Sequence, residues 1–207
     1  SLLHPDRPLD LIRNFIIYDN NVKKICRYKQ YFAVKKCMKR ILLQDGADTR
    51  NGVVWHTQGS GKTITMIMLT KMIIRESMKP SSSIKRPRFV MVTDRINLDK
   101  QIRDNFIHTQ MSPHGAKTGK GLIELLKEDG NTVITALVNK FEAAVKQEYC
   151  NDSENIFVFI DEGHRTQYGK LNIYMNRVLP NAVKIAFTGT PLMQKKPKDD
   201  KRDVMSA

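Results

Sequence analysis

Cysteine is scarce in this 207-residue sequence, and the few cysteines present do not form a metal or disulfide framework. The three residues Cys26, Cys37 and Cys150 are odd in number and lie in apolar contexts, without the close pairs found in zinc sites and small disulfide-bonded domains. We therefore expect reduced thiols with a structural role and a cytoplasmic location.

Long apolar segments and internal repeats are also missing. The N-terminal region has no signal-like apolar stretch, no run of about 18 apolar residues occurs, and nothing repeats at a fixed period. We expect neither secretion nor a membrane partner. The length allows one large domain or two small ones with a real hydrophobic core.

Acidic residues are too few to balance the basic ones. The sequence has 35 lysines and arginines against 21 aspartates and glutamates, which gives a formal net charge of +14. A polyanionic partner, most simply nucleic acid, explains this excess. The alternative is a lysine-rich surface that is merely well solvated.

The N-terminal region predicts a β-hairpin followed by a helix. Residues 15–27 have the pattern of a hairpin that turns at 19–21. Apolar residues then recur at helical spacing from Val34 to Leu42, with lysines and an arginine on the other face. We expect an N-terminal element over residues 1–48.

The remaining sequence predicts an α/β fold with a mainly parallel sheet flanked by helices. Short apolar runs suited to strands buried on both faces alternate with helix-length segments. These runs are 53–55, 89–92, 133–134, 156–160 and 183–187. We expect a P-loop NTPase lobe over 49–194 and a polar, poorly ordered tail over 195–207. Residues 80–88 and 112–121 are expected to be basic surface loops that contact a polyanion or serve as ordinary connectors.

The strongest motif is the P-loop, which we define as residues 56–63, His-Thr-Gln-Gly-Ser-Gly-Lys-Thr. It has the context that such loops require, because an apolar strand precedes it and the apolar helix 64–74 follows. Its glycines let backbone N–H groups approach phosphates at a helix N-terminus. The residues predicted to contact the nucleotide are Gln58, Gly59, Ser60, Gly61, Lys62 and Thr63.

Within this loop, two side chains have specific expected roles. Lys62 should reach the β- and γ-phosphates of the nucleotide, and the Thr63 hydroxyl should ligate Mg²⁺. His56 occupies the position that a glycine holds in the common pattern. A packing or turn role for His56 is favoured over a catalytic one.

Two further strands end in residues suited to the same chemistry. Residues 156–160 are followed by Asp161 and Glu162, which are expected to hold Mg²⁺ and to orient the attacking water. His164 either bonds a neighbouring motif or packs. Thr188 and Thr190 follow the run 183–187 and are expected to couple the phosphate state to motion, although a simple turn has the same pattern.

Arg27 and Gln30 precede the sheet and form a weaker motif. A glutamine amide can recognise the edge of adenine through paired hydrogen bonds. The alternative is the solvated start of a helix.

Three motifs of this sequence resemble, in order, motifs I, II and III of superfamily 2 helicases and translocases. They are the P-loop, Asp161-Glu-Gly-His164 and Thr188-Gly-Thr-Pro191. The chain resembles more closely the motor (R) subunit of type I restriction enzymes. This resemblance rests on the P-loop that begins with histidine, on Asp94-Arg95 with Leu98-Asp99, and on several stretches from Leu9 to Pro191. It implies the first RecA-like lobe of such a motor.

The resemblance also implies roles for matching residues. Arg27 and Gln30 would read adenine, and Arg95, Thr135, Asn139 and Lys140 would lie beside double-stranded DNA. At position 139 the family tends to have glutamine.

The family implies ATP-driven DNA translocation coupled to cleavage of foreign DNA, with ATP and Mg²⁺ as cofactors. It also implies partners: a second RecA-like lobe and a nuclease domain in the parent chain, and separate modification and specificity subunits. No E-x-K nuclease motif accompanies Asp6 and Asp10. We expect a fragment that alone is nearly inactive in hydrolysis. The alternatives are the first lobe of another superfamily 2 motor and a nucleotide-dependent DNA-binding module without hydrolysis.

Overall fold

The protein is described by a computed structural model that covers residues 6–43, 47–57, 59–128, 130, 132–161, 168–189 and 204–206. The helices are α1 Asp6–Asn14, α2 Tyr28–Ile41, α3 Ala47–Arg50, α4 Lys62–Ser77, α5 Ile96–His108, α6 Gly119–Lys127, α7 Val138–Val145 and α8 Tyr168–Val178. The strands are β1 Ile16–Asp19, β2 Val22–Ile25, β3 Gly52–Trp55, β4 Arg88–Thr93, β5 Pro113–Gly115, β6 Val133–Leu137, β7 Ile156–Asp161, β8 Val183–Thr188 and β9 Val204–Ser206.

The larger sheet is parallel throughout and confirms the predicted fold class. Its strand order is β5-β6-β4-β7-β8-β3-β9, and each neighbouring pair runs in the same direction. All five predicted apolar runs are strands of this sheet. Because the strands are parallel, their carboxyl ends meet at one edge, where ligands bind in open α/β sheets.

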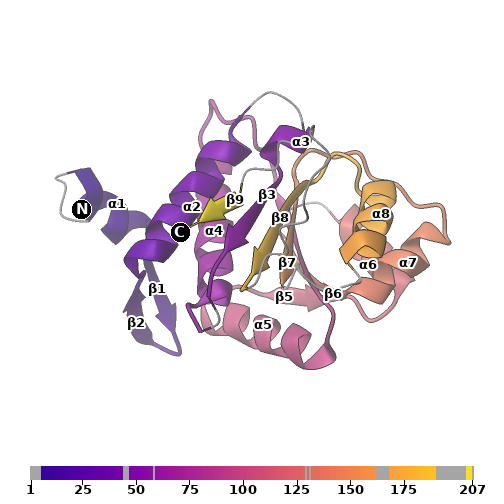
Figure 1. The fold of residues 1–207 in the computed structure, drawn as a ribbon, viewed down its shortest axis with the longest axis horizontal. Coiled ribbons are helices and arrows are strands. Elements are labelled where there is room, and N and C mark those ends of the chain that lie inside the picture. Colours follow the sequence, from indigo (N-terminus) through magenta and orange to yellow (C-terminus); the bar gives the residue numbers. More distant parts are fainter. Residues whose placement is uncertain are drawn as a thin grey trace.

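Helices cover both faces of the sheet (Figure 1), and each face has its own hydrophobic core. On one face, α2, α4 and α5 pack on strand residues such as Phe89 and Phe159. On the other face, α6, α7 and α8 pack on residues such as Val90 and Val158. Alternating strand residues thus enter opposite cores, which explains why the strands have continuous apolar sequences.

Helix α4 lies deep in the first core, as its sequence predicts. Met66, Ile67, Met68 and Leu69 are all buried, so nearly a full turn of the helix is covered. A helix this apolar gains about 1.5–3 kcal/mol for each large side chain that it buries. This burial fixes the start of α4 at Lys62, directly after the P-loop.

The N-terminal hairpin is also confirmed. β1 and β2 pair antiparallel, and Asn20 and Asn21 both have positive φ angles, of 48° and 62°. Positive φ at both central residues is typical of the tight type I′ hairpin turn, which asparagine tolerates. Phe15 and Tyr31 from this region belong to the same core as α4, so the N-terminal element packs directly on the sheet layer.

Several elements differ from the expectations. Helix α1 was not predicted, and residues 112–121 contain β5 and the start of α6 rather than a loop alone. In residues 80–88, Ser82 and Ile84 are buried and Arg88 begins β4. The expected tail contributes β9, which pairs with β3.

Burial also differs from the expectations at two places. Only Val54 of β3 is fully buried, because β3 lies near the sheet edge, and Leu42 is exposed beyond the end of α2.

Among the described residues, no helix is long and apolar enough to cross a membrane.

Candidate nucleotide-binding site

The P-loop connects the carboxyl end of β3 to the first turn of α4. Gly59 and Gly61 have φ angles of 78° and 85°, a region that residues with a side chain rarely adopt. At Gly61 a Cβ atom would lie 2.5 Å from Nε2 of Gln30, whereas at Gly59 no described residue beyond the chain neighbours has an atom within 4 Å of that position. Both glycines are therefore required by backbone conformation, and Gly61 is required by space as well. Gln58 lies outside the described residues.

The N-terminus of α4 is available to an anion. Gly61 is the N-cap of this helix and, as a glycine, has no side chain with which to cap it by a hydrogen bond. The first N–H groups of a helix have no partner within it, and the helix dipole favours negative charge at this end. A phosphate group would satisfy these donors.

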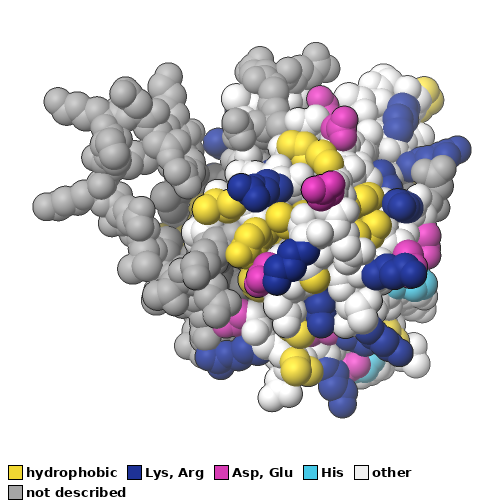
Figure 2. Space-filling model, turned by 90° about the vertical axis from the view of Figure 1, so that its right-hand side faces the viewer, with side chains coloured by type: hydrophobic (Ala, Val, Ile, Leu, Met, Phe, Trp, Pro, Cys, Tyr) yellow, Lys and Arg dark blue, Asp and Glu magenta, His cyan; other side chains and the backbone are white. Residues whose placement is uncertain are grey.

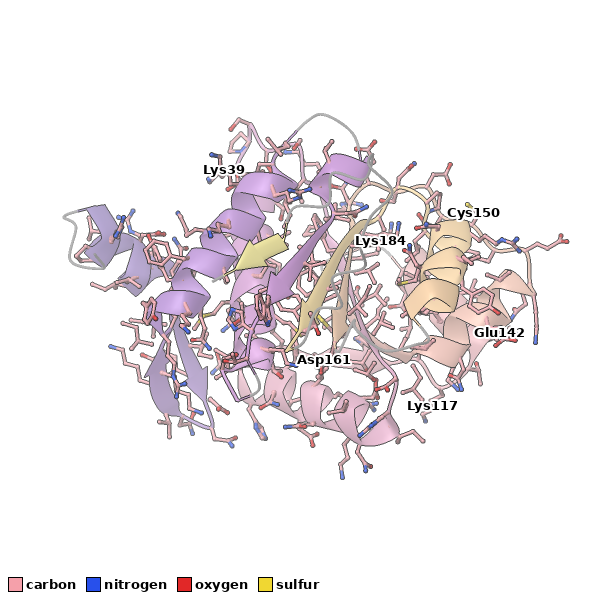
Figure 3. All side chains as sticks on the ribbon, in the orientation of Figure 1. Lys39, Lys117, Glu142, Cys150, Asp161 and Lys184 are labelled. Carbon is pink, nitrogen blue, oxygen red and sulfur yellow. The ribbon has the colours of Figure 1, made fainter. Side chains whose placement is uncertain are left out.

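Lys62 and Asp161 come together at this point from separate strands. The Nζ atom of Lys62 lies 3.9 Å from Oδ1 of Asp161, and the two side chains are 13% and 11% exposed. Lys62 follows β3, and Asp161 ends β7, with β8 between the two strands. Figure 3 shows Asp161 at one end of the sheet and Lys184 at the other. The predicted pairing of the P-loop with the strand ending at Asp161 thus exists in three dimensions.

The oxygen atoms near Lys62 suit a hard cation such as Mg²⁺. Thr63 is the next residue of α4 and contributes a hydroxyl group, and Asp161 contributes a carboxylate. No cluster of three or more His, Cys, Asp or Glu side chains that could hold a metal occurs among the described residues. Mg²⁺ is commonly held by one or two protein ligands together with phosphate oxygens and water. The side chains therefore fit Mg²⁺ that arrives with a nucleotide.

His56 stabilises the loop from within. Its backbone N–H donates to the Thr188 carbonyl at 2.9 Å, and its Nδ1 lies 3.1 Å from Oγ of Ser60, which in turn donates to the Thr57 carbonyl. The side chain is 3% exposed, and Nε2 has no hydrogen-bond partner among the described residues.

Burial lowers the pKa of His56, and the positive charges of Lys29 and Lys62 lower it further. We infer a neutral imidazole that donates from Nδ1, because the Ser60 hydroxyl already donates to Thr57. The contacts support the packing and turn role favoured for His56.

Gln30 lies against the P-loop. Its Oε1 accepts from the Arg27 backbone N–H at 2.8 Å, and its Nε2 donates to the carbonyls of Ser60 and Gly61 at 3.1 and 3.3 Å. The side chain is 4% exposed. These contacts could not be recognised in the sequence because they depend on the packing of α2 against α4.

A cleft of about 390 Å³ adjoins this contact. The residues that line it are Lys24, Ile25, Arg27, Gln30, Gly59, Ser60, Gly61 and Ile64. Lys24 and Ile25 belong to the hairpin and were not predicted to lie near the nucleotide. Their contribution follows from the position of the hairpin next to α2 rather than from any motif.

The residues expected to couple phosphate state to motion are only partly described. Thr188 ends β8 and is 2% exposed, and its carbonyl accepts the hydrogen bond from His56. It therefore connects the third motif to the P-loop through the backbone. Glu162, His164 and Thr190 lie outside the described residues.

The residues expected beside DNA lie farther along the same sheet edge. Arg95 occupies the N-cap position of α5, just after β4. Asn139 and Lys140 lie in the first turn of α7, just after β6. Arg95 and Asn139 are exposed and Lys140 is half-buried. Thr135 differs, because it lies inside β6 with 1% exposure and its hydroxyl has no hydrogen-bond partner among the described residues.

The basic charge is not gathered on the face formed by α6, α7 and α8. In Figure 2 the Lys and Arg side chains on this face are scattered, with Asp and Glu side chains among them. The net charge of +14 therefore does not by itself identify a binding surface on this face.

Sequence comparison matches the chain to one family and to restriction enzymes. The sequence model of the SWI2/SNF2 ATPase family matches residues 29–205. The chain is 32% identical over 220 residues to the type I restriction enzyme HindI endonuclease subunit of Haemophilus influenzae, covering 93% of this chain and 20% of the relative. It is 26% identical to the SsaAORF53P endonuclease subunit of Staphylococcus saprophyticus, covering 98% and 21%. The chain thus spans about a fifth of the length of the curated relatives it matches.

Solved structures share the fold at low sequence identity. The Sulfolobus solfataricus SWI2/SNF2 ATPase core in complex with double-stranded DNA matches with a TM-score of 0.63 and 16% identity, over 89% of this chain and 35% of that one. The UvsW helicase of bacteriophage T4 matches with a TM-score of 0.60 and 12% identity, over 92% and 61%. The expected RecA-like architecture and the resemblance to type I restriction subunits are both confirmed.

Proposed function

This chain belongs to the SWI2/SNF2 ATPase family, and we propose that it is a motor lobe of a type I restriction endonuclease subunit that binds Mg·ATP and duplex DNA. The observation that carries this proposal is the approach of Lys62 to Asp161 at 3.9 Å beside the N-terminus of α4, where the cap residue is a glycine. A lysine, a carboxylate and helix N–H groups at one point are what a magnesium nucleotide requires. The names of the relatives supply the restriction context.

In this proposal, each residue of the site has a distinct task. Lys62 would contact the β- and γ-phosphates, and Thr63 and Asp161 would hold Mg²⁺ arriving with ATP. When bound, Mg²⁺ would offset charge on the phosphates. Glu162, next in sequence to Asp161, orients the attacking water, and His164, Thr188 and Thr190 couple phosphate release to motion. The hydrogen bond from His56 to Thr188 supports a direct connection between the P-loop and this last group.

Duplex DNA would lie along the carboxyl edge of β4 and β6. Arg95 follows β4, and Asn139 and Lys140 follow β6. Arg95 and Asn139 are exposed and Lys140 is half-buried. Contacts from arginine and lysine to phosphates give affinity without sequence specificity. This agrees with a motor that moves along DNA, with sequence recognition left to a specificity subunit. The buried Thr135 would support β6 rather than touch DNA.

The remaining partners are also proposals. We propose that residues 1–48 form an adenine-side element and 49–194 the motor lobe, with a second RecA-like lobe and a nuclease domain elsewhere in the parent chain. Modification and specificity subunits would complete the complex. Arginines from a second lobe stabilise the transition state in such motors, so this chain alone would bind ATP and hydrolyse it very slowly.

One alternative has an observation in its favour. The chain shares its fold with the T4 UvsW helicase over 61% of that chain, so another superfamily 2 helicase or remodelling motor would use the same site. A DNA-binding module without hydrolysis is disfavoured by the presence of a lysine, a threonine and a carboxylate at the expected positions.

The test is ATP hydrolysis by the 207-residue chain, with and without duplex DNA. We expect negligible turnover by the wild type in both conditions and clear binding of Mg·ATP, which Lys62→Ala weakens at least about tenfold. Glu162→Gln should retain binding. Rapid DNA-stimulated turnover that Glu162→Gln abolishes would show that the chain needs no second lobe. Absence of ATP binding by the wild type would refute the proposed function.

A further inference from the structure

The excess positive charge of the chain is concentrated in one short segment. Residues 20–44 contain eight lysines and arginines and no aspartate or glutamate, so they supply +8 of the formal net charge of +14. This segment forms strand β2 and helix α2. By contrast, acidic and basic side chains are mixed on the face formed by α6, α7 and α8 (Figure 2). More than half of the net charge therefore comes from α2 and the residues beside it.

Helix α2 has a buried face and an exposed face of opposite character. Lys29, Lys36 and Lys39 are all exposed. At 3.6 residues per turn, these three lysines and Tyr28 lie within an arc of about 100° around the helix axis. We call the surface formed by these four residues the cationic face. The other side of the helix packs into the core through the buried residues Gln30, Tyr31, Ala33, Val34, Cys37, Met38 and Ile41.

The charges of α2 do not serve the stability of the helix. Its first turn has no acidic residue and contains Lys29, although the dipole favours negative charge at that end. Lys35 and Lys39 are four residues apart, a spacing at which like charges repel. Asp10 pairs with Lys35 at 3.1 Å, but no carboxylate of the described residues pairs with Lys29 or Lys39. An arrangement that opposes folding points to a role in binding.

The cationic face matches the backbone of duplex DNA in length and in the type of its donors. Lys29 and Lys39 are ten residues apart, which is about 15 Å along the helix. The major groove of DNA is about 12 Å wide, so the two lysines can reach phosphates on both of its sides. Tyr28 is 55% exposed, and the Nζ atom of Lys29 lies 6.0 Å from the centre of its ring. Lysine and tyrosine side chains are both common donors to DNA phosphates.

This face lies away from the sheet edge proposed for DNA. In Figure 1, α2 lies on one flank of the molecule and α7 on the other. The strand order leads to the same separation, because β4, β7 and β8 lie between β6 and β3. DNA on the cationic face would therefore make a contact separate from the one at β4 and β6.

We propose that the cationic face of α2 binds the phosphate backbone of duplex DNA, as a second contact outside the sheet edge. This inference rests on the proposed function, which makes duplex DNA a ligand of the chain. Contacts between lysine and phosphate give affinity without reading the sequence. Two separate contacts on one ligand also raise the overall affinity beyond that of either contact alone.

The test measures binding of a labelled DNA duplex by fluorescence anisotropy over a range of salt concentrations. The cationic-face variant combines Lys29→Gln, Lys36→Gln and Lys39→Gln. We expect it to bind at least about tenfold more weakly at low salt and to depend less on salt, because up to three phosphates are no longer neutralised. Its Tm should be unchanged or higher, because repulsion between like charges is relieved. The control variant removes the same charge from exposed lysines elsewhere: Lys79→Gln, Lys127→Gln and Lys146→Gln.

Three outcomes would overturn the inference. Equal losses for the cationic-face and control variants would show that only the net charge matters. Loss of DNA affinity in Arg95→Gln but not in the cationic-face variant would limit DNA to the sheet edge and leave the proposed function intact. Polyglutamate serves as an acidic polypeptide probe. If the cationic-face variant loses polyglutamate affinity by a larger factor than DNA affinity, the face belongs to an acidic protein segment instead.

Discussion

The two ends of the same sheet edge are built differently. At the β3 end, Gln30 and His56 are buried, and their side chains hold the P-loop through hydrogen bonds of 3.1 to 3.3 Å. At the β4 and β6 end, Arg95 and Asn139 are exposed, and within the described part of the chain they contribute charge or polarity without a comparable network.

Under the proposed function, this difference predicts two modes of binding, one for the nucleotide and one for DNA. A site held by buried hydrogen bonds is fixed before the ligand arrives, so small changes in it have large effects. A surface of exposed charges binds through many weak, salt-dependent interactions, and the removal of one is tolerated. Substitutions at each end of the edge should separate the two modes.

The largest effect is expected at Gly61. Gly61→Ala places a methyl group against Gln30 and also forces an unfavourable φ of 85°. Gly59→Ala imposes a similar backbone cost, about 1–2 kcal/mol, without any close atom. We expect roughly hundredfold weaker ATP binding for Gly61→Ala and about tenfold for Gly59→Ala. Equal losses in a binding titration would show that the Gln30 side chain contributes nothing.

A pH-dependent effect is expected at His56. The pKa of this group is lowered in the folded protein from its ordinary value of 6.5, so the unfolded chain binds the proton more readily. The contribution of His56 to stability is therefore complete above pH 6.5 and is lost as the pH falls below it. His56→Asn keeps a polar donor near the position of Nδ1 but does not titrate.

Urea unfolding from pH 8 to pH 5 measures this effect. The wild type should lose more stability than His56→Asn as the pH falls, and the exposed His114→Asn should follow the wild type. Parallel curves for wild type and His56→Asn would contradict the buried neutral imidazole.

A smaller effect is expected at the DNA end. Arg95→Gln and Lys140→Gln should each weaken duplex DNA binding a few-fold at low salt. Each should also make the binding less dependent on salt. The slope of the logarithm of the DNA association constant against the logarithm of the salt concentration should fall in magnitude by about 0.9 for each phosphate that is no longer neutralised. Lys79→Gln is the control, because Lys79 follows α4 at the opposite edge of the sheet and pairs with Glu76. An equal change for Lys79→Gln would indicate that only the net charge matters.

The smallest effect is expected at Thr135. Its buried hydroxyl has no hydrogen-bond partner among the described residues, so Thr135→Val keeps the shape and removes an unsatisfied polar group. We expect stability to change by less than about 1 kcal/mol and DNA affinity to stay the same. A clear loss of DNA affinity at unchanged stability would show that Thr135 moves to the surface and contacts DNA.

Much of the fold could be predicted because its signals are local. The apolar runs of β4, β7 and β8 and the asparagine turn between β1 and β2 are contained in a few residues each. Strand β5 could not be predicted, because Pro113-His-Gly115 has no strand pattern and forms a strand only by pairing with β6. Strand β9 likewise depends on β3.

The candidate site, like the fold, could be predicted from the sequence only in part. The motif spacing predicted that Lys62 and Asp161 meet, since both lie at the carboxyl ends of parallel strands. The sequence could not predict that the Gln30 amide nitrogen donates to the Ser60 and Gly61 carbonyls, because this requires α2 to pack on α4. Motif spacing identifies which residues meet, whereas tertiary packing decides which atoms remain available.

The most direct test of the proposed nucleotide site is a titration of the chain with Mg·ATP, followed through the fluorescence of its single tryptophan. Trp55 ends β3 directly before the P-loop, is 40% exposed, and donates its Nε1–H to the Gly189 carbonyl at 2.9 Å. We expect saturable binding by the wild type and at least about tenfold weaker binding by Lys62→Ala. Equal affinity of the two proteins would contradict the assignment of this loop as the phosphate site.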